Sequence, residues 1–466
     1  MITVSPEEVL EAMEQENPWW KGDKLLPSRF SKLAPRQFLS GFLELVVPEK
    51  PHREVVLLGP RRVGKTYLIH HAIGHLAKNE DVSPSQILYL QLDNPLYVGL
   101  SLEKLLAYFE QATGSDWRKK RCFIFFDEVQ YLKDWEVHLK SLHDSGSPTK
   151  FVVSGSAGAA LSHGSRESGA GRFTDFLLPP LTFAEYLSFR DQDALVEQDD
   201  DGIFATDIEA LNEQFLNYLN YGGYPEIALL TEANQNTARF MRSDIIDKVL
   251  LRDLPSLYGI TDVRELNRLF TMLAFNSGHE ISMESLSKNS AVAKNTIKRY
   301  MEYLEAAFLI RTVTRVDENA RRFKRDHSYK VYLTNPSLRT GLFSPLTFES
   351  EHLGHVAETS IFAQRFHYPH EHLHYARWKS GKKHLEVDVV KLDATLRAET
   401  VTEVKFTDRV VKQPGTWDPW LDFCRKNKLR DLTITTRTEQ LQKEVDGIKI
   451  SFVPTALQVF EMGRVE

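Results

Sequence analysis

Short apolar runs alternate with amphipathic stretches in the first 180 residues of the chain. The runs "EVVLL" (Glu54–Leu58), "CFIFF" (Cys122–Phe126) and "KFVV" (Lys150–Val153) have the length of strands and carry little polar alternation. Such runs are typical of strands buried on both faces of a parallel sheet. The first run leads through a glycine-containing turn into the helical pattern "YLIHHAIGHL". The pattern predicts an α/β domain with a parallel sheet.

The middle of the chain has helical apolar spacing followed by two strand-like pieces. "HEISMESLSKNSAVAKNTIKRYMEYLEAAFLIRTVTRV" predicts helix, short turn, helix and strand, with apolar positions at Leu286, Val292, Ile297, Tyr300, Met301 and Leu304. "TRVDENARRFKRDHSYKVYLTN" places a basic tip between two strand-like pieces. We interpret this region as a helix-turn-helix with a basic wing.

The last third predicts a further mixed α/β region. "GHVAETSIFAQRF" has the pattern of an amphipathic helix, and "HLEVDVVKLD" and "AETVTEVKFTD" have the patterns of strands. With 466 residues, the chain is too long for one ordinary domain. We predict an N-terminal segment (1–40), an α/β core (41–180), a small helical domain (181–240), a helical and winged-helix domain (241–345) and a last domain (346–466).

Composition and charge narrow the class of protein. The chain is 42% hydrophobic and 11% aromatic, as globular proteins are. No apolar run approaches the roughly 20 residues that span a bilayer, and the two cysteines, Cys122 and Cys424, have no metal-ligand spacing. We expect a cytoplasmic protein with no membrane partner. The net charge of −6 hides a basic region, residues 236–345, with 18 Lys and Arg against 12 Asp and Glu.

The sequence "GPRRVGKT" matches the phosphate-binding pattern G-x-x-x-x-G-K-[ST]. Glycines let the loop backbone wrap phosphates, and the following helix directs its first amides at them. We expect ATP to contact the whole loop, with Lys65 on the β- and γ-phosphates and the Thr66 hydroxyl on Mg²⁺. The loop consists of Gly59, Pro60, Arg61, Arg62, Val63, Gly64, Lys65 and Thr66.

A second motif follows about sixty residues later. The buried run before it ends in Asp127-Glu128. Asp127 at the carboxyl end of a strand would hold the Mg²⁺ shell, and Glu128 would polarise the attacking water. Ser154 or Ser156, after the third run, would sense the γ-phosphate or orient water, or else cap the next helix.

Two arginines, Arg166 and Arg172, precede another apolar strand. An arginine there would complete the ATP site of a neighbouring subunit as a finger, or it would be a solvated loop residue.

These motifs resemble the AAA+ family of bacterial and archaeal ATPases. The resemblance rests on Gly59–Thr66, "FFDEVQYLKDWEVHLKSLHD", "FVVSGSA" and "GAGR". It implies a parallel αβα core with a small helical lid, which we place from "LTFAEYLSF" through "LNEQFLNYLNYGGYPEIALL". It also implies a homo-oligomer, with a hexamer as the leading expectation and a monomeric switch as the alternative.

The basic residues of the helix-turn-helix and wing are candidate DNA contacts. One helix would enter the major groove and the wing would contact phosphates, mainly for affinity and not for base readout. The same fold also serves as a protein-interaction module, so a protein partner is the alternative. The candidate residues are Lys294, Lys298, Arg299, Arg321, Arg322, Lys324 and Arg325.

The last third holds three carboxylates and a lysine in a suggestive order: Glu358, Asp388, then Glu403 and Lys405 two residues apart. Residues two apart on a strand share a face, and clustered carboxylates bind Mg²⁺ while a lysine positions water. The order resembles the PD-(D/E)xK nuclease superfamily. This resemblance implies catalytic roles for all four residues, with Asp388 and Glu403 as metal ligands, or a fold retained without cleavage.

Together these features predict an ATP-hydrolysing AAA+ protein that acts on DNA, in DNA processing or in defence. Its nuclease-like domain would cleave DNA with Mg²⁺ under the control of ATP. Two alternatives remain open: a junction-migrating or unwinding motor whose nuclease fold does not cleave, and a nucleotide-operated signalling switch with a protein partner.

Overall fold

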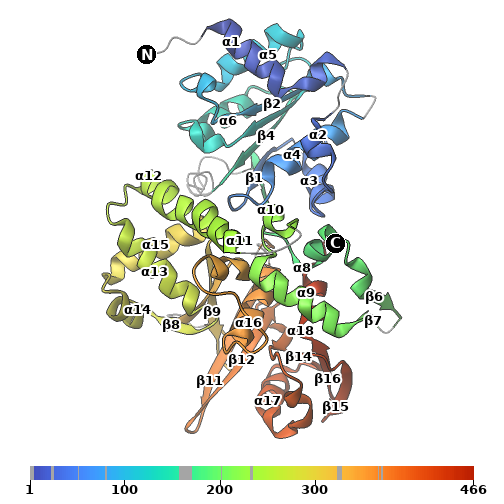
Figure 1. Cartoon of the computed structure of the whole chain (residues 1–466), viewed down its shortest axis with the longest axis vertical. Coiled ribbons are helices and arrows are strands. Elements are labelled where there is room, and N and C mark those ends of the chain that lie inside the picture. The colour runs from blue at the N-terminus through green and yellow to red at the C-terminus, as the bar shows by residue number, and fades with distance from the viewer. Residues whose placement is uncertain are drawn as a thin grey trace. The chain divides into compact units, whose positions relative to one another are not determined.

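The computed structural model contains two compact units, one ending at Leu178 and the other running from Pro179 to Arg464. We call them the first and the second unit (Figure 1). The structure describes residues 5–22, 26–50, 52–78, 81–156, 171–200, 202–230, 235–322, 328–365, 367–368 and 371–465.

The first unit is built on a five-stranded parallel sheet in the order β2-β3-β4-β1-β5 (Figure 1). Its strands are β1 (Glu54–Leu58), β2 (Ile87–Gln91), β3 (Phe123–Asp127), β4 (Lys150–Gly155) and β5 (Phe173–Leu177). Its longer helices are α1 (Pro6–Glu16), α3 (Leu39–Val46), α4 (Lys65–Leu76), α5 (Leu102–Thr113) and α6 (Trp135–Asp144). The predicted α/β class with a parallel sheet is confirmed.

The three predicted apolar runs are the inner strands of this sheet. Every residue of β1, β3 and β4 is buried. Because all five strands are parallel, their carboxyl ends meet at one edge of the sheet. That edge receives the loop after β1 and the acidic end of β3, so the topology positions the candidate nucleotide site.

The N-terminal segment covers the outer strand β2. The Asn17 side chain donates to the Tyr89 carbonyl at 2.8 Å and accepts from the Tyr89 amide at 2.7 Å. The indole nitrogens of Trp19 and Trp20 both donate to the Ile87 carbonyl, at 3.1 and 2.8 Å. These bonds satisfy an otherwise unpaired strand edge.

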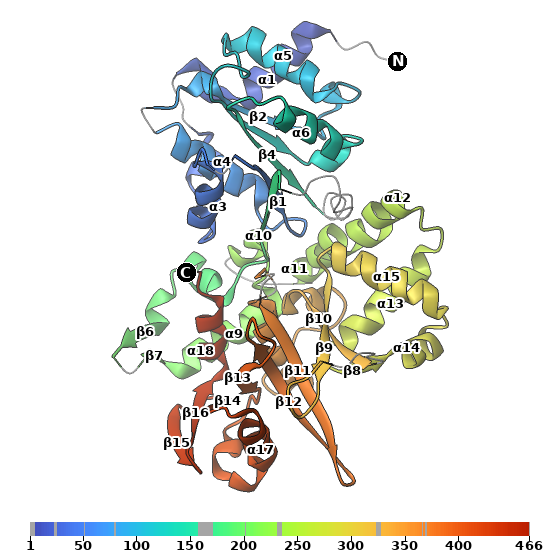
Figure 2. The same ribbon diagram turned by 180° about the vertical axis from the view of Figure 1, so that it is seen from behind.

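The second unit contains a nine-stranded mixed sheet in the order β15-β16-β14-β13-β12-β11-β9-β10-β8, in which β11 and β12 form a long hairpin (Figure 2). Its strands are β8 (Glu280–Ser282), β9 (Ile310–Val316), β10 (Ser328–Leu333), β11 (His372–Ser380), β12 (Lys383–Leu392), β13 (Ala398–Glu403), β14 (Asp431–Thr436), β15 (Leu441–Val445) and β16 (Ile448–Pro454). The sheet continues through residues that we assigned to two domains, and the predicted domain borders stay predictions.

The helices of residues 181–240 belong to the core of the second unit. Phe183 of α8 (Phe183–Phe189) and Phe215 of α9 (Ile208–Tyr221) are buried with Ile361 of α16 (Leu353–Ala363) and Leu457 of α18 (Thr455–Gly463). The segment also contains the small hairpin β6 (Val196–Asp199) and β7 (Gly202–Ala205) and the short helix α10 (Pro225–Ala228). Its role as a lid stays a prediction.

The glycine pair before α10 has a packing reason. A Cβ atom on Gly223 would lie 2.3 Å from the Asn335 side-chain oxygen, closer than side chains come in proteins. Gly223 therefore lets α9 approach the segment after β10.

Three helices precede and interleave with β8, β9 and β10. They are α13 (Val263–Phe275), α14 (Met283–Ser290) and α15 (Lys294–Ala306). A long helical stretch comes before them, α11 (Gln235–Phe240) to α12 (Leu254–Tyr258), with π-helical turns at Met241–Asp247 and Val249–Asp253. The helix α17 (Asp418–Asn427) lies within the C-terminal part of the sheet region.

Within the described part of the chain, no helix is long and apolar enough to cross a membrane. Cys122 and Cys424 are both free and buried.

Candidate functional sites

The phosphate-type loop lies between β1 and α4, at the carboxyl edge of the first unit's sheet. Gly64 has a φ of 95°, in the left-handed region that favours glycine, and α4 begins at the next residue, Lys65. The helix therefore starts inside the motif and directs its first backbone amides at the loop. This is the arrangement that binds phosphate at a helix N-terminus.

Lys65 lies across this loop. Its ammonium donates to the Gly59 carbonyl at 3.0 Å and to the Pro60 carbonyl at 2.9 Å. Only 5% of the residue is exposed, and burial lowers the pKa of Lys65, although Glu128 and Asp127 act in the opposite direction. The ammonium is thus held by neutral acceptors within reach of two carboxylates.

Asp127 is the centre of a hydroxyl network. Its Oδ2 accepts from the Thr66 hydroxyl at 2.6 Å and from the Tyr89 hydroxyl at 2.9 Å. Its Oδ1 accepts from the Ser154 hydroxyl. Thr66 and Asp127 are therefore in direct contact, and oxygen donors of this kind fit a hydrated Mg²⁺ ion.

Glu128 has an unusual backbone conformation, with a φ of 57° that is uncommon for a residue other than glycine. Its amide donates to Asp127 Oδ1 at 3.1 Å and to Ser154 Oγ at 3.3 Å, and its carboxylate accepts from the Gln130 amide. Burial raises the pKa of Glu128, which Lys65 partly opposes. A carboxylate with a raised pKa next to the loop fits a general base.

Two predicted residues at this site differ in placement. Ser154 bonds Asp127 and the Glu128 amide, so it orients the acidic motif.

Arg172 precedes β5, which pairs with β1 from Glu54 onward. Arg172 therefore lies at the amino edge of the sheet, opposite the loop. There Arg172 Nε donates to Asp144 Oδ1 at 2.8 Å. Arg172 does not join the site of its own chain, a finger role in a neighbour stays a prediction, and Arg166 lies outside the described residues.

Sequence reasoning missed two supporting residues. Tyr89 donates to Asp127, and Arg36 donates through Nη1 to the Val63 carbonyl at 2.6 Å, which fixes the loop from the N-terminal segment. Tyr89 lies in the apolar run "ILYLQ", where a polar group amid apolar residues was the available signal. For Arg36 the sequence offers no signal.

In the second unit, the structure brings together the four residues of the nuclease-like order. Lys405 Nζ lies 2.5 Å from Glu403 Oε1 and 3.4 Å from Asp388 Oδ2. The backbone amide of Asp388 donates to Glu403 Oε2 at 3.2 Å. Glu358 enters the cluster from α16, and a shared partner, Lys330, joins it to Asp388.

Lys330 on β10 was not predicted. Its Nζ lies 2.7 Å from Glu358 Oε1, 2.7 Å from Glu386 Oε1 and 3.7 Å from Asp388 Oδ1, and its side chain is only 3% exposed. Its ammonium therefore lies among three carboxylates, one of which, Asp388, is a predicted metal ligand. The signal was a lysine inside the strand "SYKVYL", since a buried lysine is almost always paired.

The electrostatics of this cluster follow from burial and these pairs. Burial would lower the pKa of Lys330, but Tyr332, Glu358 and Asp388 hold that pKa well above its usual value. Burial raises the pKa of Glu358 to about 7, against the effect of Lys330. Burial would also raise the pKa of Asp388, but Lys405 and Lys330 lower it.

A cavity of about 360 Å³ opens onto this cluster. Its lining includes Lys330, Glu358, Asp388 and Lys405, with His355 and Arg377 beside them. Arg377 Nη1 lies 3.1 Å from Glu280 Oε2. The cluster is therefore accessible to a ligand and contains both charge signs.

The candidate DNA-binding residues lie on α15 and at the end of β9. Lys298, Arg299, Arg321 and Arg322 are exposed. The exposed Lys294 is paired with Glu284 at 2.7 Å, and Arg322 Nη2 contacts His374 Nε2 at 3.0 Å. Lys324 and Arg325 lie outside the described residues.

Comparison with known families agrees with the first of these sites. Residues 51–187 match an AAA domain family, and residues 212–348 match a family described as a domain of unknown function. Neither match covers residues 349–466, so the nuclease resemblance of that part stays a prediction.

Several curated proteins are similar along much of the chain. An uncharacterized protein of Methanocaldococcus jannaschii is 24% identical over 347 residues, which are 72% of this chain and 72% of that protein. An uncharacterized protein of Haemophilus influenzae is 22% identical over 410 residues, 85% of this chain and 92% of that protein. Neither name assigns a function.

Two solved structures also match, at low structural similarity. The ORC2 protein of Aeropyrum pernix has 14% identity and a TM-score of 0.30, covering 60% of this chain and 88% of that one. The Cdc6p protein of Pyrobaculum aerophilum has 13% identity and a TM-score of 0.27, covering 70% of this chain and 96% of that one. TM-scores this low do not establish that the chain shares the overall fold of either structure.

The loop, the acidic motif and the parallel sheet all lie within or beside residues 51–187. The first unit of the chain therefore contains an AAA domain of the P-loop ATPase class.

Proposed function

We propose that the chain binds ATP with Mg²⁺ in its first unit, hydrolyses it, and uses the nucleotide state to control how the second unit grips DNA. The observation that carries the proposal is the contact of Thr66 with Asp127 beside Lys65 and Glu128, within an AAA domain. The loop amides and Lys65 would hold the phosphates. Thr66 and Asp127 would hold Mg²⁺, which supplies charge neutralisation on the phosphates.

Glu128 is proposed as the residue that accepts a proton from the attacking water. Its raised pKa suits a base, and Gln130 and Ser154 fix its side chain and backbone. Ser154 also bonds Asp127, so one hydroxyl couples the metal ligand to the base. Hydrolysis would then change the contacts of the γ-phosphate with this network.

The DNA-binding part of the proposal rests on the order α13, β8, α14, α15, β9 and β10, which we interpret as a winged helix. The exposed Lys298 and Arg299 project from α15, the helix that would enter the groove. Arg321, at the base of the wing, would add phosphate contacts. Lys294 would first have to leave Glu284.

For the C-terminal cluster, we propose a grip without cleavage. A metal ion bound by the predicted ligands Asp388 and Glu403 would lie next to two ammonium groups: Lys330, 3.7 Å from Asp388, and Lys405, which contacts both carboxylates. Two like charges at contact distance in a buried site repel strongly. Lys330 thus favours the alternative in which the nuclease-like fold does not use Mg²⁺ to cut DNA.

The test is a gel assay with labelled single-stranded, duplex, forked and four-way DNA, with Mg²⁺ and with or without ATP. The wild type would run beside Lys65→Ala, the charge reversal Lys298→Glu with Arg299→Glu, and a matched reversal elsewhere, Arg118→Glu with Lys119→Glu. We expect ATP-dependent DNA binding that is lost in the first two variants and kept in the matched control. The DNA strands should remain intact.

Other outcomes separate the alternatives. Strand cleavage by the wild type that disappears in Asp388→Asn would refute the non-cleaving grip and establish a nuclease. ATP hydrolysis without binding to any DNA would refute the DNA part and favour a switch with a protein partner. Strand separation driven by ATP would assign the motor alternative.

A further inference from the structure

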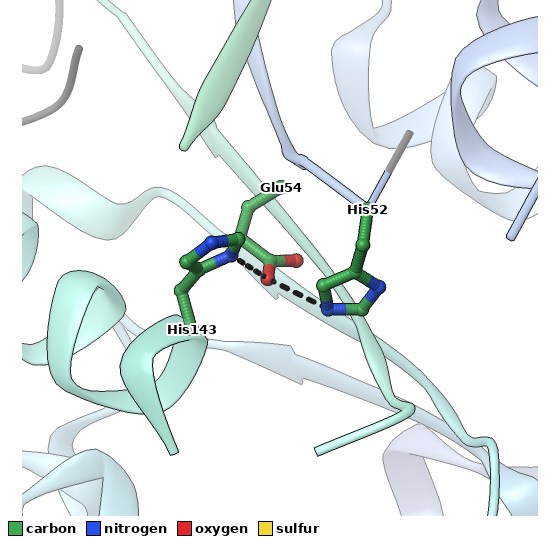
Figure 3. Close-up of side chains that lie close together, drawn as sticks. All are labelled: His52, Glu54 and His143. Atoms are coloured by element: carbon green, nitrogen blue, oxygen red, sulfur yellow. Dashed lines mark hydrogen bonds and ion pairs between the residues drawn. The ribbon is translucent and has the colours of Figure 1, made fainter. Parts of the chain in front are cut away.

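Three side chains converge at the amino edge of the first unit's sheet, opposite the phosphate loop (Figure 3). They are Glu54 at the start of β1, His52 just before it, and His143 in the last turn of α6. His143 Nδ1 lies 2.9 Å from Glu54 Oε1, and His52 Nε2 lies 3.5 Å from the same oxygen. Each of the three residues offers one possible metal-ligand atom, and these atoms all lie within 4.8 Å of one another.

Glu54 is positioned as a metal-binding carboxylate is. Its side chain is fully buried, and Oε2 accepts from the backbone amide of Phe151 at 2.8 Å. That bond fixes the carboxyl group and leaves Oε1 directed at the two imidazoles. A hydrogen bond to the oxygen that does not bind the metal is the usual support of a carboxylate ligand.

The two histidines have the properties that ligands need. Each presents a ring nitrogen to the same carboxylate oxygen of Glu54, and imidazole nitrogens are ligands that Zn²⁺ prefers. The His52 side chain is 33% exposed and that of His143 is 18% exposed, so a solvent molecule can reach the space between them.

We propose that His52 Nε2, Glu54 Oε1 and His143 Nδ1 bind a divalent ion of the zinc class, with water as the fourth ligand. Two nitrogens and one oxygen are donors that Zn²⁺ prefers, at about 2.0–2.2 Å each. Ligands of a tetrahedral ion stand roughly 3.3 Å apart, close to the 2.9 and 3.5 Å contacts at Glu54. Small rotations of the imidazoles complete the site.

The site is separate from the nucleotide chemistry. It lies at the opposite end of β1 from the phosphate loop, and it joins three segments: the entry to β1, β1 itself and the end of α6. The bound ion therefore stabilises the fold of the first unit and takes no part in ATP hydrolysis. The two positive groups nearby, Lys150 and Arg121, moderate the affinity.

The experiment measures Zn²⁺ binding by the full chain after treatment with a chelator, using calorimetric titration and competition with a chromogenic chelator. The variants are His52→Gln and His143→Gln, alone and together. The matched control is His138→Gln on the same helix α6, because His138 faces a single carboxylate, Glu103, at 3.7 Å. We expect one equivalent of tight binding in the wild type and control.

Each of the two ligand variants should weaken that binding at least about 10-fold, as the loss of a well-placed partner does at metal sites. Zn²⁺ should also raise the melting temperature of the wild type and control and not that of the double variant, because a ligand that binds only the folded state stabilises it. Equal Zn²⁺ affinity and stoichiometry in the wild type and double variant would overturn the proposal, as would an absence of tight binding to the wild type. Circular dichroism of each variant verifies that it is folded.

Discussion

Two buried lysines, Lys65 in the first unit and Lys330 in the second, hold their ammonium groups in opposite ways. Lys65 donates to the neutral carbonyls of Gly59 and Pro60, and its pKa is lowered, first of all by burial. Lys330 contacts three carboxylates, and its pKa is held well above its usual value. A carbonyl gives up an ammonium to a phosphate easily, whereas a buried carboxylate left behind is costly. Lys65 is thus poised for an anionic ligand, and Lys330 is already part of a neutralised cluster.

The acidic residues of the two sites show the same contrast. Asp127 accepts from the hydroxyls of Thr66 and Tyr89. Asp388 instead contacts two lysines, Lys405 at 3.4 Å and Lys330 at 3.7 Å. Hydroxyls orient a carboxylate without cancelling its charge, so Asp127 retains its attraction for Mg²⁺. An aspartate therefore accepts from hydroxyls in one unit and pairs with lysines in the other.

The largest expected effect tests the proposed role of Lys65 in ATP hydrolysis. Lys65→Ala should lower ATP hydrolysis by about 1000-fold, because a preorganised charge at the phosphates is lost from a water-poor site. Lys330→Met, which removes the other buried ammonium, should leave the hydrolysis rate in the absence of DNA within about twofold of the wild type. The measurement is steady-state phosphate release. A similar loss in both variants would contradict the contrast between the two lysines.

The next effect separates binding of the nucleotide from its hydrolysis. Glu128→Gln should slow hydrolysis by about 100-fold, because the amide cannot accept the proton of the attacking water. ATP affinity, measured by calorimetry, should stay near that of the wild type. In the wild type the rate should rise with pH through the raised pKa of Glu128, and this rise should be absent in the variant. Loss of ATP binding in Glu128→Gln would instead assign this residue to the structure of the loop.

The geometry of the candidate ATP site was predictable because its main residues lie in two contiguous stretches of sequence. The pattern Gly59–Thr66 fixes the loop, and the buried run before Asp127 fixes the strand, so the parallel sheet follows from local sequence. Arg172 could not be placed this way, because its position depends on which end of β5 meets which end of β1. Whether β5 runs parallel to β1 is decided by their pairing in the folded sheet and not by the residues beside Arg172.

The C-terminal cluster was predictable only in part for the same reason. The strand alternation and the two-residue spacing of Glu403 and Lys405 indicated a shared face. Lys330 comes from β10, which reaches the cluster because β8, β9 and β10 continue into the C-terminal sheet. No local pattern predicts that continuity. A tertiary contact therefore changes the chemistry expected of a cluster whose members were proposed from their order in the sequence.

A smaller effect concerns the stability of the second unit around Lys330. Lys330→Met should destabilise β10 and α16 locally by about 3 kcal/mol, since it leaves buried carboxylates without their partner. The measurement is the amide hydrogen exchange of these two elements in the full chain. Adding Glu358→Gln to Lys330→Met should restore part of the loss, because one of the stranded charges is removed. Unchanged protection in Lys330→Met would mean that water or Lys405 compensates, and that the ammonium is not central to the cluster.

The smallest expected effect is a pH dependence of stability that arises from Glu358 in the second unit. Burial raises the pKa of Glu358 from its ordinary 4.5 to about 7 in the folded state. Between these values the folded state holds the proton and the unfolded state does not, so the contribution of Glu358 to stability is complete below pH 4.5 and is lost as the pH rises towards 7. His355, whose pKa burial lowers to about 4, contributes in the opposite direction, but it is present in every variant and cancels in a difference. The local stability of α16, measured by hydrogen exchange, should therefore fall less steeply with rising pH in Glu358→Gln than in the wild type. Glu444→Gln, on the exposed face of β15, should match the wild type. An identical slope in Glu358→Gln would show that Lys330 keeps Glu358 ionised throughout, and the cluster would then be a full ion pair at every pH where the protein folds.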